Sequence, residues 1–201
     1  MTTVAIIGAG PFGRSLALRA ARAGFRVFLE DVLPANLQQA RDSIHRELTP
    51  KNPPGIDSAG FAPPRIAFVS SIEDAVRDAD LVIDCVPDEL ESKLEILWLV
   101  DRMAPPRTVI ATPTLNLSIA DLAGCTNRPE KCLAIAAPLT GLAVAVADDT
   151  SRAAPAGGLD SSVPPMLLLR AAPSTSEESS FLAAVFFRRL GFAAVVERGS
   201  A

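Results

Sequence analysis

The stretch AIIGAGPFGRS (residues 5–15) decides the fold, because an apolar run passes through three closely spaced glycines into a helical pattern. Gly8, Gly10 and Gly13 are spaced as G-x-G-x-x-G. In such a unit the first glycine permits a tight turn, the second lets the backbone approach a phosphate, and the third allows close packing of helix on strand. The helix that follows favours an anion through its free N–H groups and the positive end of its dipole. The stretch therefore predicts a strand, a turn and a helix that bind the pyrophosphate of a dinucleotide.

An acid at the end of the second apolar run strengthens this interpretation. Asp31 follows that run at a distance suited to bonding both hydroxyls of the adenosine ribose. Glu30 precedes it and no arginine follows directly, so a 2'-phosphate would face two carboxylates. The alternative, in which the glycines only close a turn, is disfavoured by the coincidence of acid and context. We predict NAD rather than NADP, with contacts from Gly8, Gly10, Pro11, Phe12, Gly13 and Asp31.

The rest of the chain alternates short apolar runs with helical patterns. Strands are expected at residues 3–7, 25–30, 65–69, 81–86, 107–112, 132–137, 165–171 and 193–197. Helices are expected at residues 11–23, 34–48, 72–77, 89–103, from 118 onward, and at 176–190. This repetition predicts an α/β fold: a doubly wound, mostly parallel Rossmann sheet with helices on both faces. We interpret residues 1–201 as a single domain.

Local signals mark several boundaries in this pattern. Ser71 and Ser118 are expected to cap helices, and Gly24 and Gly191 to end them. Trp98 lies beside a leucine stripe and is expected in the core. Residues 49–64, rich in Pro and Gly, are expected to form a loop, and residues 139–165 a flexible loop or lid.

Composition excludes several classes of function. A net charge of -4 without a basic cluster argues against nucleic acid and against an anionic membrane surface. The apolar runs are too short to cross a membrane, and no targeting segment is visible, so we expect a cytoplasmic protein. The single histidine, His45, and the cysteines lack the spacing of metal ligands, so no metal is expected. The absence of tyrosine excludes the Tyr and Lys proton transfer of short-chain dehydrogenases.

Four segments follow one another as they do in 3-hydroxyacyl-CoA dehydrogenases: GAGPFGRSLALRAARAGFRVFLED, IEDAVRDADLVIDCVPDELESK, ATPTLNLSIADLA and RPEKCLAIAAP. The chain resembles the N-terminal NAD-binding domain of that family from Val4 to about Glu197. The resemblance implies that Asp88 and Lys93, which follow the fourth strand, lie near the cofactor, together with Val86. On the residues alone, a solvated helix N-terminus explains the two charges equally well.

The chain departs from the family where catalysis takes place. The family's turn of Asn-Thr-Ser-Ser-Leu type reads TPTLNLS here, which places Leu115 at the serine position. Ala136 stands where the resemblance implies the catalytic histidine, and Leu168 or a neighbour where it implies the carboxylate partner. No catalytic residue is assigned. The polar side chains expected near the cleft, none with an identifiable partner, are Asp84, Asp88, Lys93, Thr114 and Asn116.

Two functions remain open. The first is an NAD-dependent oxidoreductase that acts on a 3-hydroxyacyl or 3-oxoacyl thioester, or a related compound, by an altered mechanism. The alternative is a catalytically inactive NAD-binding or protein-interaction module. The chain ends where the family continues into a helical domain, so we expect no such domain here. An apolar patch left in its absence would be covered by a second copy or by a partner protein.

Overall fold

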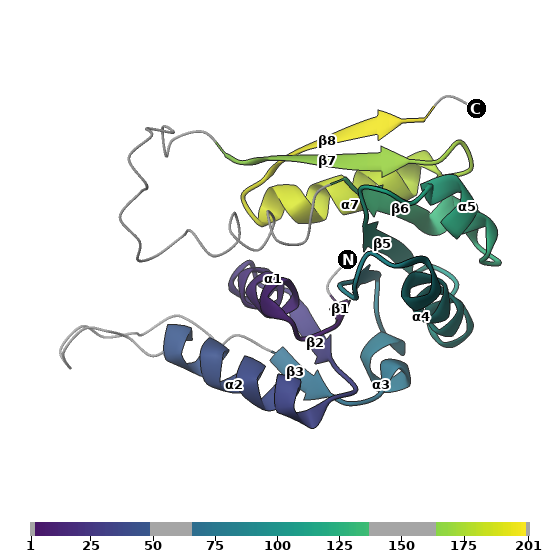
Figure 1. Ribbon diagram of the computed structural model, residues 1–201. Coiled ribbons are helices and arrows are strands. Elements are labelled where there is room, and N and C mark those ends of the chain that lie inside the picture. Colours follow the sequence, from purple (N-terminus) through teal and green to yellow (C-terminus); the bar gives the residue numbers. More distant parts are fainter. Residues whose placement is uncertain (1–2, 49–65, 137–163, 200–201) are drawn as a thin grey trace.

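One sheet runs through the computed structural model, which describes residues 3–48, 66–136 and 164–199 (Figure 1). Its strands are β1 (Thr3–Ile7), β2 (Arg26–Glu30), β3 (Ile66–Val69), β4 (Leu81–Asp84), β5 (Val109–Pro113), β6 (Cys132–Ile135), β7 (Met166–Ala171) and β8 (Ala193–Arg198). They lie in the order β3-β2-β1-β4-β5-β6-β7-β8, and every neighbouring pair is parallel except β6 and β7. The predicted doubly wound, mostly parallel sheet is confirmed.

Helices cover both faces of this sheet. The helices on one face are α1 (Pro11–Arg22), α2 (Pro34–Leu48) and α7 (Glu177–Arg189), and those on the other are α3 (Ile72–Val76), α4 (Leu90–Met103) and α5 (Ile119–Gly124). A short 3-10 helix, η1 (Pro129–Lys131), leads into β6. Because both faces are covered, every residue of β1 is buried, which explains the unbroken apolar run from Val4 to Ile7.

The predicted boundaries agree with the structure to within about two residues. Ser71 accepts a hydrogen bond from the N–H of Asp74 at the start of α3, and Ser118 caps α5 in the same way. Gly24 and Gly191 adopt φ of +86° and +88°, the left-handed conformation expected after a helix. The predicted loop at 49–64 and nearly all of the predicted lid at 139–165 lie outside the described residues.

Trp98 corrects one prediction, because its side chain is 53% exposed rather than buried in the core. Leu97, its neighbour, occupies the buried position. Successive helical residues are separated by about 100°, so Leu97 and Trp98 face different surroundings. The guanidinium of Arg102 lies 4.7 Å from the centroid of the indole ring, which covers part of the exposed face.

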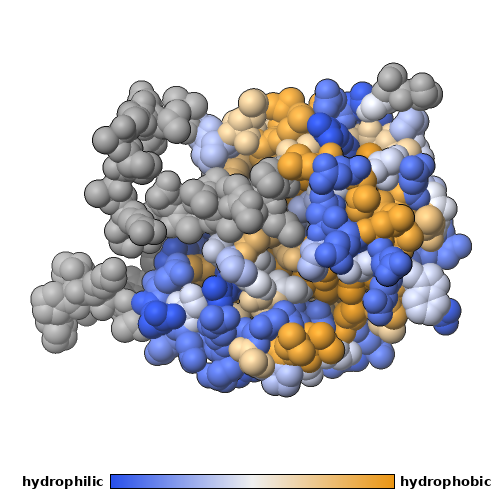
Figure 2. Space-filling view, viewed as in Figure 1, coloured by the Kyte–Doolittle hydropathy of each residue, from blue (hydrophilic) through white to orange (hydrophobic). Residues whose placement is uncertain are grey.

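Other apolar side chains are also exposed, and Figure 2 shows apolar patches in its upper, right-hand and lower parts. The large ones are Val32, Leu33, Leu90, Met103, Leu115, Met166, Phe181 and Val195. The partner predicted to cover such a patch stays a prediction. Within the described residues, no helix combines the length and the apolar character needed to cross a bilayer.

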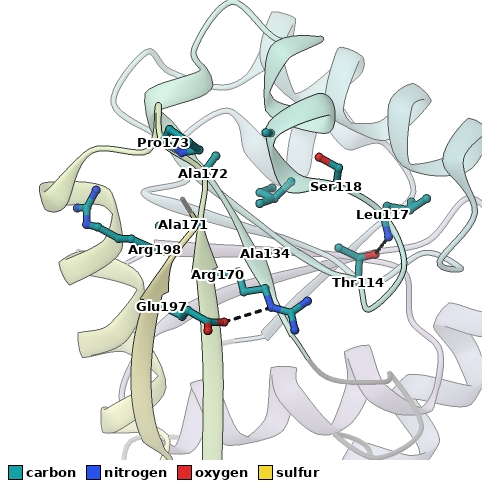
Figure 3. Close-up of a pocket in the computed structure, with 13 residues that line it drawn as sticks. Thr114, Leu117, Ser118, Ala134, Arg170, Ala171, Ala172, Pro173, Glu197 and Arg198 are labelled. Carbon is teal, nitrogen blue, oxygen red and sulfur yellow. Dashed lines mark hydrogen bonds and ion pairs between the residues drawn. The ribbon is translucent and has the colours of Figure 1, made fainter. Parts of the chain in front are cut away.

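The last two strands extend the sheet beyond the parallel core. β7 runs antiparallel to β6 and parallel to β8, which forms one edge of the sheet. Arg170 on β7 lies opposite Glu197 on β8, with 3.5 Å between Nε and Oε2 (Figure 3). This cross-strand ion pair is largely solvent-exposed, so its contribution to stability is small.

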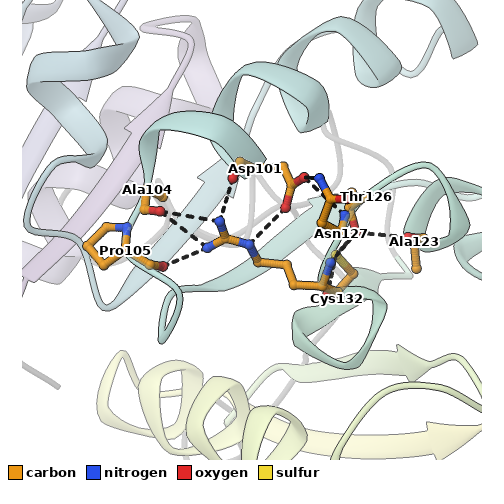
Figure 4. Close-up of polar contacts among 8 residues, drawn as sticks. Asp101, Ala104, Pro105, Ala123, Thr126, Asn127 and Cys132 are labelled. Carbon is orange, nitrogen blue, oxygen red and sulfur yellow. Dashed lines mark hydrogen bonds and ion pairs between the residues drawn. The ribbon is translucent and has the colours of Figure 1, made fainter.

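A second arginine joins the end of α4 to the turn before η1 (Figure 4). The Nε of Arg128 lies 2.8 Å from Oδ1 of Asp101, and its Nη atoms donate to the carbonyl oxygens of Asp101, Ala104 and Pro105. Burial acts to raise the pKa of Asp101, but hydrogen bonds from Asn127 and Arg128 outweigh it and lower that pKa. Arg128 thus satisfies carbonyls that the end of a helix leaves open.

Candidate functional site

The first glycine of the motif turns the chain at the carboxyl edge of the sheet. Gly8 has φ of +102°, and a Cβ placed on it would lie 3.2 Å from the carbonyl carbon and oxygen of Cys85. Its N–H donates to the carbonyl of Glu30 at 2.8 Å, which holds the turn against β2. Any side chain at this position would be strained and crowded, so the tight turn predicted at Gly8 is present.

The other two glycines differ in their surroundings. A Cβ on Gly13 would lie 1.9 Å from the carbonyl oxygen of Gly8, so only glycine permits this packing of α1 on β1. A Cβ on Gly10 would meet no heavy atom within 4 Å. Pro11 opens α1, no side chain caps this helix, and Phe12 is buried in the core. The helix therefore begins with uncapped N–H groups beside open space, as an anion requires.

Asp31 joins the glycine turn to the start of α2. Its Oδ2 accepts from the N–H of Ala9 at 2.9 Å, and its Oδ1 accepts from the N–H of Leu33 at 2.9 Å. The side-chain amide of Asn36 donates to both oxygens, at 3.1 and 3.0 Å. The carboxylate is thus oriented by the chain itself. Its contact with a ribose stays a prediction, in which the hydroxyls would take the place of Asn36.

Glu30 is a buried acid that sequence reasoning considered only for its charge. Its side chain is 4% exposed and has no hydrogen-bond or ion-pair partner among the described residues. Burial, with a smaller effect from Asp31, raises its pKa from 4.5 to about 7. Two adjacent acids at this edge still disfavour a 2'-phosphate, although Glu30 is partly protonated near neutral pH.

A buried ion pair fixes the loop between β4 and α4. Lys93 is wholly buried, and its Nζ lies 3.1 Å from Oδ2 of Asp84 and 3.3 Å from the carbonyl oxygen of Val86. Asp84 also accepts from Oγ1 of Thr112 at 2.9 Å and from the N–H of Val86 at 3.0 Å. Burial raises the pKa of Asp84, while Lys93 and the hydrogen bonds oppose that rise. The backbone N–H of Val86 thus donates to Asp84, and its carbonyl oxygen accepts from Lys93. A direct contact of Lys93 with the cofactor stays a prediction.

Asp88 joins that loop to the loop after β5. Its Oδ2 accepts from the N–H of Leu115 at 3.2 Å, whereas its Oδ1 is buried and has no partner. Thr114 accepts from the N–H of Leu117 at 3.0 Å. The sequence identifies no partner for Asp84, Asp88, Lys93 or Thr114, because these bonds depend on how the loops fold together. The unpartnered Oδ1 is an acceptor suited to a ligand hydroxyl.

Ala136, to which the resemblance assigns the catalytic base, lies beside Leu168, to which or to a neighbour of which it assigns the carboxylate partner. The N–H of Ala136 donates to the carbonyl oxygen of Leu168 at 2.8 Å, next to the paired Ile135 and Leu169. Neither Ala136 nor Leu168 can accept a proton. His45 is exposed on α2 and is not part of this arrangement.

A cavity of about 550 Å³ opens beside these positions (Figure 3). Its walls come from the loop after β5, the start of α5, and strands β6, β7 and β8. Arg170 and Ala134, both lining residues, lie two residues along the chain from Leu168 and Ala136, respectively. Glu197 is the only carboxylate among its described lining residues, and it is paired with Arg170. Within the described part of the chain, no group of His, Cys, Asp and Glu is arranged to hold a metal ion.

The described residues fit NAD. The uncapped start of α1 suits the pyrophosphate, Asp31 and the unpartnered oxygen of Asp88 suit hydroxyls, and Gly10 leaves room beside the helix. The sequence model of "3-hydroxyacyl-CoA dehydrogenase, NAD binding domain" matches residues 3–136. The chain belongs to this family. It is thus a domain of the NAD-dependent 3-hydroxyacyl-CoA dehydrogenase family, and NAD is its cofactor.

Curated relatives agree with this assignment. A 5-formyl-3-hydroxy-2-methylpyridine 4-carboxylate 5-dehydrogenase from Mesorhizobium japonicum is 33% identical over 128 residues, which cover 64% of this chain and 41% of the relative. A probable 3-hydroxybutyryl-CoA dehydrogenase from Bacillus subtilis is 31% identical over 134 residues, covering 65% and 46%. The chain therefore spans less than half the length of these relatives.

A solved structure extends the likeness beyond the region matched in sequence. The crystal structure of 3-hydroxybutyryl-CoA dehydrogenase from Escherichia coli K12 matches with a TM-score of 0.76 and 25% identity, covering 99% of this chain and 38% of that chain. The likeness therefore includes β7, α7 and β8, which follow the last residue matched by the family's sequence model.

Proposed function

We propose that the chain is the NAD-binding part of an oxidoreductase that acts on a 3-hydroxyacyl or 3-oxoacyl thioester, or a related 3-hydroxy compound. The observation that carries this proposal is the uncapped start of α1 beside open space at Gly10, with Asp31 oriented next to it. The names of two relatives, a 3-hydroxybutyryl-CoA dehydrogenase and an L-carnitine dehydrogenase, support this class of substrate.

NAD, when bound, supplies the hydride chemistry. The first turn of α1 would hold the pyrophosphate, and Asp31 would orient the adenosine ribose. The ion pair of Asp84 and Lys93 keeps Val86 in place, and the unpartnered Oδ1 of Asp88 would accept a hydroxyl of the cofactor. The substrate proton has no acceptor at Ala136 or Leu168, so its transfer follows a different route from that of the family's histidine.

Loss of a general base costs about 10²- to 10⁴-fold in rate, which slows an oxidoreductase without abolishing it. The test incubates the purified chain with NADH and acetoacetyl-CoA and follows the absorbance of the reduced nicotinamide. We expect slow oxidation that depends on protein concentration. An unchanged absorbance with each of several 3-oxoacyl thioesters would contradict the proposal that the chain is an oxidoreductase.

The second candidate is an NAD-binding module without catalysis, favoured by the apolar side chains of Ala136 and Leu168. Calorimetry with NAD separates the two, since binding without turnover supports the module. Under either function we propose that a second copy or a partner protein covers the exposed apolar side chains. Light scattering that shows only monomer at micromolar concentration would argue against self-association.

A further inference from the structure

Arg14 differs from every other arginine in the described residues because its side chain has no partner. Each of the others donates to a carbonyl, pairs with an acid or stacks on a ring. On the same helix, Arg19 donates to the carbonyl of Leu190 and Arg22 to that of Glu47. Within residues 3–48, 66–136 and 164–199, no hydrogen bond, ion pair or ring contact involves the guanidinium of Arg14.

The place of Arg14 in α1 is unfavourable for a cation. Its N–H donates to the carbonyl of Gly10 at 3.0 Å, which closes the first turn, so the residue lies near the positive end of the helix dipole. That turn contains no acidic residue to compensate the charge. Arg19 and Arg22, by contrast, lie in the last turn, where the dipole favours them. No acidic side chain within the described chain forms an ion pair with Arg14.

Arg14 shares the outer side of the helix with Pro11, three residues before it. Pro11 is exposed and Arg14 is half-buried, whereas Phe12 and Gly13 face the core. Side chains in a helix lean toward its N-terminus, so we expect the guanidinium of Arg14 to extend along the first turn. This direction leads to the uncapped N–H groups and the open space beside Gly10.

We propose that Arg14 binds the pyrophosphate of the cofactor, as a charged contact added to the backbone N–H groups of the glycine turn. The planar guanidinium can donate two parallel hydrogen bonds to one phosphate. Its charge also offsets the repulsion between the two phosphates and the nearby acids Glu30 and Asp31. The inference rests on NAD binding and does not depend on which substrate is used.

The test uses isothermal calorimetry of the full chain with ADP-ribose, which has the pyrophosphate, and with adenosine, which lacks it. We expect Arg14→Gln to weaken ADP-ribose binding about ten-fold or more, the usual effect of one charge-assisted hydrogen bond. Arg14→Lys should retain part of the affinity. Adenosine binding should not change, and the salt dependence of ADP-ribose binding should become shallower in Arg14→Gln.

Arg22→Gln is the matched control, because Arg22 is exposed on the same helix but at its far end. It should bind both ligands as the unchanged chain does. Equal affinity of Arg14→Gln and the unchanged chain for ADP-ribose would overturn the inference and leave NAD binding intact. An equal loss for adenosine would overturn it too, since it would show a role in folding. Failure of the unchanged chain to bind ADP-ribose would overturn both the inference and NAD binding.

Discussion

Replacement of Glu30 by glutamine should remove a pH-dependent loss of stability. Burial raises the pKa of Glu30 from 4.5 to about 7, so the folded chain keeps a proton that the unfolded chain releases. This contribution to stability is complete below pH 4.5 and is lost as the pH rises through 7. Each pKa unit corresponds to about 1.4 kcal/mol, so the loss amounts to about 3 kcal/mol.

The assay measures the free energy of unfolding in urea at pH 5 and pH 8. Glutamine cannot ionise, so the stability of Glu30→Gln relative to the unchanged chain should rise by about 2–3 kcal/mol between the two pH values. The difference between pH values is the informative quantity, since the buried amide has its own pH-independent cost. Glu95→Gln, at an exposed position on α4, should show no such change. An equal offset for Glu30→Gln at both pH values would refute the reasoning.

Three further substitutions test other parts of the structure. Gly13→Ala should lower the free energy of unfolding in urea by about 3 kcal/mol and abolish NAD binding in calorimetry, because its Cβ would overlap a carbonyl oxygen. The control is Gly124→Ala, whose Cβ would meet no atom within 4 Å, and it should be near neutral in both measurements. Lys93→Met should cost about 3–5 kcal/mol in urea unfolding by leaving Asp84 buried without its partner, and a loss below about 1 kcal/mol would contradict the ion pair. Arg128→Ala should lower the midpoint of thermal unfolding by several degrees, and an unchanged midpoint would show that its contacts are dispensable.

The fold was predictable because its signals are local. Ser71 and Ser118 cap helices where the sequence places them, and Gly24 ends α1 in the expected conformation. The exposure of Trp98 was not predictable, since it depends on the angle at which α4 lies on the sheet. Leu97 and Trp98 are both at the edge of the apolar stripe, and only the packed structure selects Leu97.

Some features of the candidate site could be predicted from the sequence and others could not. The roles of Gly8 and Gly13 follow from backbone geometry within one turn and could be derived from their spacing. The pairing of Lys93 with Asp84 could not, because it joins a helix to a strand end through a fold in the chain. The sequence also could not show that the guanidinium of Arg14 has no partner among the described residues, because this requires the positions of all its neighbours.

The backbone bridge between Ala136 and Leu168 has a consequence for design. Ala136, directly after β6, faces Leu168 on β7, so histidine at the first position and glutamate at the second would stand as direct neighbours. The structure thus pairs the backbones of the two positions to which the resemblance assigns proton transfer. The double substitution Ala136→His with Leu168→Glu would therefore test whether this backbone supports proton transfer.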